Sequence, residues 1–201
     1  MLILCRHGQT AANAKGLLLG RADLPLTDIG RAQAAAQGLE LAAILGGKGA
    51  RLLTSPLQRC RETAAAYGAP GSGSVEPETD DRWIELDYGA FDGRPAHEVP
   101  SETWAEWRVD PQFTPPGGES LALLGIRVRA ACEQLAPIAA MVDVVVVSHV
   151  SPIKAAVAWA LGVGDEIAWR THLDVASITR IAIGPAGPSL RSFNETQHLA
   201  K

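Results

Sequence analysis

Two strongly apolar runs that each end in a histidine constrain the fold of this chain most. The first, Met1 to Cys5, is too short for a core helix and leads directly into Arg6-His7-Gly8. The second, Val142 to Val147, is β-branched and almost wholly apolar, and it leads into Ser148-His149. Such runs are typical of parallel strands that are covered on both faces. Both histidines would then stand at the carboxyl ends of their strands, where open α/β sheets bind ligands.

The remaining segments follow a regular alternation along the chain. Helical spacing or helix-start signals occur at about residues 27–45, 55–67, 119–140 and 150–161, with Thr27 and Ser55-Pro56 as expected helix starts. Short strands are expected near residues 51–54 and 76–81, a loop at 70–74, and a closing hairpin between 177 and 193. Strands that alternate with helices predict an α/β fold with a doubly wound, mostly parallel central sheet flanked by helices.

The chain shows no linker and no repeat, so we expect a single domain over residues 1–201. Its least regular part, residues 94–118, is expected to form a small lid subregion, with Trp104 and Trp107 on a short helix.

Charge and composition exclude several kinds of partner. The formal net charge is −4, which gives no general attraction for nucleic acid or anionic membranes. No run of about 20 apolar residues is present, and the amino terminus does not resemble a signal peptide. The three cysteines are widely spaced and odd in number, and we interpret them as reduced thiols of a cytoplasmic protein. The sequence leaves a homodimer open.

Two arginines join the two histidines at the expected sheet edge. Arg6 precedes His7, and Arg59 lies in the first turn of the helix that follows Ser55-Pro56. Right-handed crossovers bring the carboxyl ends of parallel strands to one edge. Two cations and two imidazoles around one point predict a bound anion, and a phosphoryl group carries about −1.5 to −2 charge. A neutral His7 could attack its phosphorus atom, while the other groups stabilise the oxygens.

The leaving alkoxide would need a proton, and the stretch Trp83 to Gly93 offers several carboxyl groups. Packing against aromatic rings would raise the pKa of such a carboxyl and suit it to act as a general acid. The residues alone leave four candidates, namely Glu85, Asp87 and Asp92 in this stretch and Asp81 just before it.

Arg6-His7-Gly8-Gln9-Thr10 with Asn13 resembles the signature of the histidine phosphatase superfamily, the phosphoglycerate mutase-like proteins. Five further motifs resemble that family in the same order: Asp23–Thr27 with Gly30 and Gln33, Ser55-Pro56 with Arg59, Glu85 with Gly89 and Gly93, Pro116–Ser120, and Ser148-His149. The resemblance therefore runs over nearly the whole chain.

The resemblance implies a role for individual residues. His7 would be the phosphorylated nucleophile, and Glu85 would be the proton donor and later the base that activates water. The phosphoryl oxygens would be bound by Arg6, Asn13, Arg59 and His149. We expect four further residues to face the substrate: Gly20, Arg21, His97 and His172. The resemblance implies no metal and no organic cofactor for hydrolysis.

The superfamily includes both phosphatases and mutases. The insertion between Gly93 and Ser120 carries only Arg94 and Arg108, well apart, whereas glycolytic mutases have an adjacent pair of arginines. The longer carboxyl-terminal tail of the mutases is also missing. We therefore expect a phosphomonoesterase that acts on a small phosphorylated metabolite and releases inorganic phosphate. The alternatives are mutase-type phosphoryl transfer and a binding module without turnover. The stretch Ser148 to Lys154 also resembles bacterial α-ribazole phosphatases.

Overall fold

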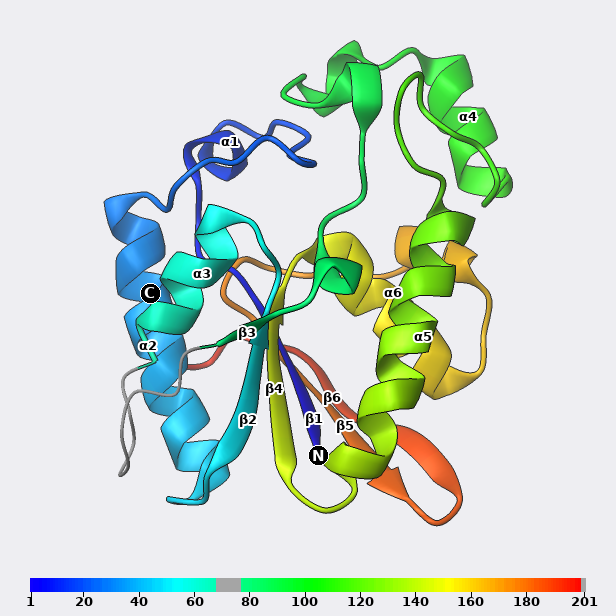
Figure 1. Ribbon diagram of the computed structural model, residues 1–201. Helices are drawn as coiled ribbons and strands as arrows, with labels where there is room; N and C mark the ends of the chain where they lie inside the picture. Colours follow the sequence, from blue (N-terminus) through cyan, green and yellow to red (C-terminus); the bar gives the residue numbers. More distant parts are fainter. Residues whose placement is uncertain (68–76, 200–201) are drawn as a thin grey trace.

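The computed structural model describes residues 1–67 and 77–199. Within these ranges six strands form one sheet in the order β3-β2-β4-β1-β5-β6 (Figure 1). Their bounds are β1 (Leu2–Arg6), β2 (Ala50–Thr54), β3 (Glu78–Thr79), β4 (Asp143–Ser148), β5 (Ile178–Gly184) and β6 (Gly187–Glu195). The first four are parallel neighbours, and β5 and β6 form the antiparallel closing hairpin. The predicted α/β fold is confirmed, and the expected loop at 70–74 lies outside the described residues.

Helices cover both faces of the sheet, as the doubly wound prediction requires. The covering helices are α2 (Asp28–Leu45) and α3 (Gln58–Ala65) on one face and α5 (Leu121–Ala139) and α6 (Val150–Leu161) on the other. The short helices α1 (Ala11–Ala14) and α4 (Ser101–Val109) lie beyond the carboxyl ends of the parallel strands (Figure 1). Alternate residues of β1 point to opposite faces. Leu2 and Leu4 belong to a core cluster with residues of α5 and α6, whereas Ile3 and Cys5 pack with residues of α2 and α3. The two clusters fix the register that places the end of β1 beside the end of β4.

The helix starts were predicted with mixed success. Thr27 caps α2 as expected, because its hydroxyl accepts a hydrogen bond from the Gly30 backbone at 3.0 Å. The prediction that Ser55 caps the next helix is wrong, since α3 begins at Gln58 and its cap residue, Leu57, is extended. The Ser55 hydroxyl instead lies 2.7 Å from Nε2 of His149. Ser55 therefore contacts a residue at the carboxyl edge of the sheet and does not cap α3.

The lid region is fastened by aromatic packing. Trp107 of α4 is fully buried and stacks on Trp104 with ring centroids 5.4 Å apart. It also meets the rings of Tyr88, Phe91, Phe113 and Trp169. Figure 1 shows this green segment above the carboxyl ends of the parallel strands. A helix with the length and apolar sequence needed to cross a membrane is absent from residues 1–67 and 77–199.

Candidate active site

The two histidines meet where β1 and β4 end. Arg6 and Ser148 are register partners in these strands, and the His7 backbone donates a hydrogen bond to the Ser148 carbonyl at 3.0 Å. The next residue along each strand is a histidine. The rings of His7 and His149 lie edge to face with centroids 5.1 Å apart, as the strand-end pattern predicts.

His7 is held in one tautomer. Its Nδ1 lies 2.7 Å from the Gly8 carbonyl oxygen, which can only accept a hydrogen bond. The proton of the neutral ring therefore sits on Nδ1, and Nε2 carries the lone pair. Burial lowers the pKa of His7 well below 6.5, and the charges of Arg59 and Arg6 lower it further. The ring is consequently neutral and nucleophilic near neutral pH.

The backbone around Gly8 is packed too tightly for a side chain. A Cβ added to Gly8 would lie 2.3 Å from the Gly30 carbonyl oxygen in α2. The Gly8 amide also donates to the Thr63 hydroxyl at 3.1 Å, and that hydroxyl donates to the Arg59 carbonyl at 2.7 Å. This chain of contacts ties the loop after β1 to α3.

Arg59 is fully buried at the start of α3. Its Nη1 and Nη2 donate to the carbonyls of Ala22 and Gly20 at 2.9 and 2.7 Å, and its Nε donates to Nδ1 of His149 at 3.2 Å. Arg59 therefore stands beside the second histidine, and it also fixes the loop that follows Gly16.

His149 is fully buried and its tautomer is also determined. Because Arg59 can only donate, Nδ1 of His149 must be the acceptor, and the proton of the neutral ring sits on Nε2. That Nε2–H donates to the Ser55 hydroxyl at 2.7 Å. Burial lowers the pKa of His149 well below 6.5, followed by the charge of Arg59. Contact between His149 and a phosphoryl oxygen stays a prediction, because both nitrogens have protein partners here.

Arg6 and Asn13 keep hydrogen-bonding capacity at this edge. Nη1 of Arg6 donates to the Leu173 carbonyl at 2.5 Å, while its buried Nε has no hydrogen-bond partner among the described residues. Oδ1 of Asn13 accepts from the Thr10 amide at 3.0 Å in the cap of α1, which leaves its amide nitrogen as a donor. Both placements are compatible with the oxyanion-binding roles that the resemblance implies.

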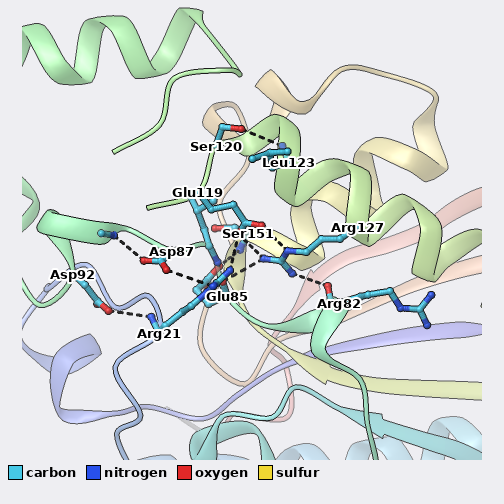
Figure 2. Close-up of polar contacts among 12 residues, drawn as sticks. Arg21, Arg82, Glu85, Asp87, Asp92, Glu119, Ser120, Leu123, Arg127 and Ser151 are labelled. Carbon is cyan, nitrogen blue, oxygen red and sulfur yellow. Dashed lines mark hydrogen bonds and ion pairs between the residues drawn. The ribbon is translucent and has the colours of Figure 1, made fainter. Parts of the chain in front are cut away.

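Glu85 reaches the site from the segment after β3. The residue is only 4% exposed, and its Oε1 accepts hydrogen bonds from the backbone amides of Leu86 at 2.8 Å and Ser151 at 3.2 Å (Figure 2). Ser151 lies in the first turn of α6, two residues after His149. Since both amides bind Oε1, Oε2 is the oxygen left to carry a transferable proton.

Two of the three rival carboxylates, Asp87 and Asp92, have structural partners. Asp92 accepts from the backbone amides of Gly20, Arg21 and Ala22 at 2.7 to 3.0 Å. Asp87 accepts from the Gly89 amide at 2.9 Å and lies 3.4 Å from Nη1 of Arg21. These contacts give both residues a task in shaping the loops, and they favour Glu85 as the proton donor.

The four residues expected to face the substrate have different surroundings. Arg21 is ion-paired with Asp87 and Glu119, and a Cβ on the buried Gly20 would lie 2.9 Å from the Leu86 carbonyl oxygen. His97 is exposed on the 3-10 helix Ala96–Glu98, and His172 is exposed with Nε2 3.0 Å from Asp174. Their contact with a substrate stays a prediction.

Two contacts of the candidate site were not predicted from the sequence. Ser55 was interpreted as a helix cap, although its position directly after β2 places it at the same sheet edge as the histidines. The Ser151 amide that binds Glu85 had no sequence signal, because a backbone donor can belong to any residue type. In the part of the chain that is described, no group of three or more His, Cys, Asp or Glu side chains is placed to hold a metal ion.

A family model described as the histidine phosphatase superfamily (branch 1) matches residues 2–196. The chain belongs to this superfamily. A bifunctional protein of Mycobacterium tuberculosis is 35% identical to this histidine phosphatase family member over 202 residues, which cover 98% of the chain but 54% of the relative. The chain thus spans about half the length of the curated relatives it matches.

Solved structures of phosphatases share the whole fold of this superfamily member. A mutant phosphoserine phosphatase of Entamoeba histolytica in complex with phosphoserine has a TM-score of 0.87 at 26% identity, covering 99% of this chain and 98% of that one. The α-ribazole phosphatase of Shigella flexneri has a TM-score of 0.80 at 26% identity, covering 96% of each chain. The predicted family and its likeness to α-ribazole phosphatases are therefore confirmed.

Proposed function

We propose that this chain is a phosphomonoesterase that hydrolyses a small phosphorylated metabolite through a phosphohistidine on Nε2 of His7. The observation that carries the proposal is the state of His7. Its ring is buried and neutral, its Nδ1 proton is bound to the Gly8 carbonyl, and its Nε2 lone pair is left as the nucleophile. Arg59 donates a hydrogen bond to His149, and the His149 ring packs against the His7 ring.

The reaction proceeds in two transfers. Nε2 of His7 attacks phosphorus, the P–O bond to the leaving group breaks, and the leaving oxygen takes a proton from Oε2 of Glu85. A water oxygen then attacks the phosphorus of the phosphohistidine while the Glu85 carboxylate takes a proton from that water. The P–N bond breaks, its electron pair returns to Nε2 of His7, and inorganic phosphate leaves. A positioned acid of this kind contributes about 10²–10⁴-fold to the rate.

Groups around the histidines stabilise the transferring phosphoryl oxygens. The guanidinium groups of Arg6 and Arg59, the Asn13 amide and an imidazole N–H of His149 offer donors at the sheet edge. For His149 this requires that a bound phosphoryl group replace one of its two protein partners.

Two features favour hydrolysis over mutase transfer. The two arginines of the insertion are separated in sequence, and Arg108 lies over the Trp104 ring at 5.6 Å from its centroid. The two solved relatives named above are phosphatases, one in complex with phosphoserine. A phosphorylated hydroxy or amino acid and a nucleotide-like phosphate are the substrate classes to test first. A cytoplasmic location and a homodimer stay predictions.

The test is a screen of phosphorylated metabolites for release of inorganic phosphate, followed by trapping. The protein should be labelled by a phosphoryl-labelled substrate when quenched without acid, and His7→Ala should abolish labelling and turnover. His198→Ala, which removes an imidazole bound to the Ala176 carbonyl, is the control and should retain both.

Three results would contradict the proposal. Full turnover in His7→Ala would exclude His7 as the nucleophile. Interconversion of 2- and 3-phosphoglycerate that outruns phosphate release in an enolase-coupled assay would indicate a mutase. Tight phosphate binding without a trapped phosphohistidine would indicate a binding module.

A further inference from the structure

Arg127 connects α5 to the backbone that carries Glu85. Its Nη1 donates to the Arg82 carbonyl at 2.7 Å, and its Nη2 lies 3.3 Å from the Glu85 carbonyl (Figure 2). The Arg127 side chain is 17% exposed. One guanidinium thus binds the carbonyls at both ends of the segment 82–85, which begins inside the 3-10 helix Asp81–Trp83.

Glu119 holds this guanidinium in a fixed plane. Nε of Arg127 donates to Oε1 of Glu119 and Nη2 donates to Oε2, each at 2.8 Å. Two parallel bonds between a guanidinium and a carboxylate restrict the orientation of both groups. The Glu119 backbone amide also donates to the Asp87 carbonyl at 2.9 Å. The backbone is therefore held on both sides of Glu85 by the same pair of residues.

The other end of Glu85 depends on this placement. Its Oε1 accepts from the Leu86 amide on the same segment and from the Ser151 amide of α6, so a shift of the backbone at residue 85 would lengthen the bond to Ser151. A general acid must stand within about 3 Å of the atom that it protonates, and a displacement of about 1 Å can cost about 10²-fold in rate.

We propose that Arg127, oriented by Glu119, is the positioning residue that fixes Glu85 for proton transfer to the leaving group. This inference rests on the proposed phosphatase function. Arg127 acts through Glu85, since its own donors are engaged by Glu119 and by two backbone carbonyls. It therefore differs from the arginines that the resemblance assigns to phosphate binding.

The experiment compares two aryl phosphates of similar shape. Phenyl phosphate needs a proton donor for its leaving group, whereas p-nitrophenyl phosphate has a far better leaving group and depends on the donor little. The value of kcat/KM reports the first transfer, to His7. We expect Arg127→Gln to lower kcat/KM for phenyl phosphate at least about tenfold more than for p-nitrophenyl phosphate. Glu85→Gln should shift the ratio in the same direction and further.

Arg129→Gln is the matched control. Arg129 lies two residues further along α5 and forms an ion pair with Asp165 at 2.7 Å. Its substitution therefore removes an ion pair comparable to that between Arg127 and Glu119. Its substitution should leave the ratio between the two substrates unchanged. Glu119→Gln keeps the side-chain shape but removes the charge that orients Arg127, so it should shift the ratio in the direction of Arg127→Gln.

Equal losses on both substrates in Arg127→Gln would overturn the inference, because they would indicate a general structural role. Should that variant fail to fold, Arg127→Lys and Glu119→Gln decide, and an unchanged ratio in both would reject the inference. Failure of the unaltered protein to hydrolyse either compound, or any metabolite in the screen, would instead count against the phosphatase function itself.

Discussion

Nε of Arg59 donates a hydrogen bond to Nδ1 of His149 across 3.2 Å, and this contact determines which ring nitrogen of His149 carries the proton. The proton therefore sits on Nε2, and this N–H group donates a hydrogen bond to the Ser55 hydroxyl at 2.7 Å. His7 has the opposite tautomer, because the Gly8 carbonyl binds its Nδ1. The two histidines at equivalent strand ends thus have opposite tautomers. Nε2 of His7 carries a lone pair, and Nε2 of His149 carries the proton that is bound to Ser55.

Ser55→Ala tests the orientation of His149. The substitution leaves a buried N–H group without its acceptor, which costs about 1–3 kcal/mol of unfolding free energy. We expect a lower thermal midpoint and a lower kcat, because His149 can then turn away from the site. Ser101→Ala, at the exposed start of α4, should change neither quantity. Unchanged kcat and stability in Ser55→Ala would show that Arg59 alone orients the ring.

The pH dependence of stability follows from the lowered pKa values of His7 and His149, which burial causes first and Arg59 second. Below pH 6.5 the unfolded chain binds protons that the folded histidines do not bind. Stability is therefore present above 6.5 and is lost as the pH falls towards the folded-state pKa values. The slope approaches about 1.4 kcal/mol per pH unit for each histidine.

Urea titrations at pH values from about one unit above to about one unit below the ordinary histidine pKa measure this slope. His7→Ala should reduce the part of this pH slope that comes from the two histidines by about half. The acid limb of the rate profile should also lie below pH 6.5, since His7 stays neutral there. An acid limb at or above the ordinary histidine pKa would contradict the burial argument.

Gly8→Ala should disturb both the fold and the nucleophile. The added Cβ would lie 2.3 Å from the Gly30 carbonyl oxygen, and neither backbone segment can move without shifting β1 or α2. We expect a loss of about 3 kcal/mol or more in unfolding free energy and a large loss of kcat. Gly49→Ala is the control, because a Cβ there meets no atom within 4 Å. Equal stability of the two variants, measured by denaturant unfolding, would reject the packing argument.

Trp107→Ala should loosen the lid. Trp107 is fully buried and contacts four rings from three other segments, so its removal leaves a large cavity that costs about 3–5 kcal/mol. The 85–93 segment would lose its contact with α4, and we expect KM to rise more than kcat falls. Trp104→Ala removes a more exposed ring from the same helix and should cost less. An unchanged KM in Trp107→Ala would show that the packing of the lid does not contribute to substrate binding.

The sequence predicted the parts of the site that follow from strand geometry. An apolar strand of parallel type must end at the ligand-binding edge, so His7 and His149 could be placed before any coordinates were known. Arg59 followed from its position in the first turn of a helix at that edge. The mostly parallel sheet followed from the same alternation of strands and helices.

Contacts between distant loops could not be predicted in this way. Arg21 was expected to face the substrate, but its partners Asp87 and Glu119 lie 66 and 98 residues further along the chain. Asp92 resembles a rival acid in the sequence, and only its three bonds to the loop at residues 20–22 give it a structural task. Side-chain pairing between loops depends on tertiary placement, which carries no local periodicity.

Arg59→Lys tests whether the guanidinium shape, rather than its charge, organises the site. Lysine keeps the charge, but one ammonium group cannot reach the Gly20 carbonyl, the Ala22 carbonyl and His149 together. We expect kcat to fall about 10²-fold and inhibition by vanadate to weaken, because both the loop and His149 lose their fixed positions. Arg61→Lys is the matched control on the same helix, since Arg61 donates only to the Pro56 carbonyl within the described residues and is exposed. Wild-type kcat and vanadate inhibition in Arg59→Lys would mean that positive charge alone suffices at this position.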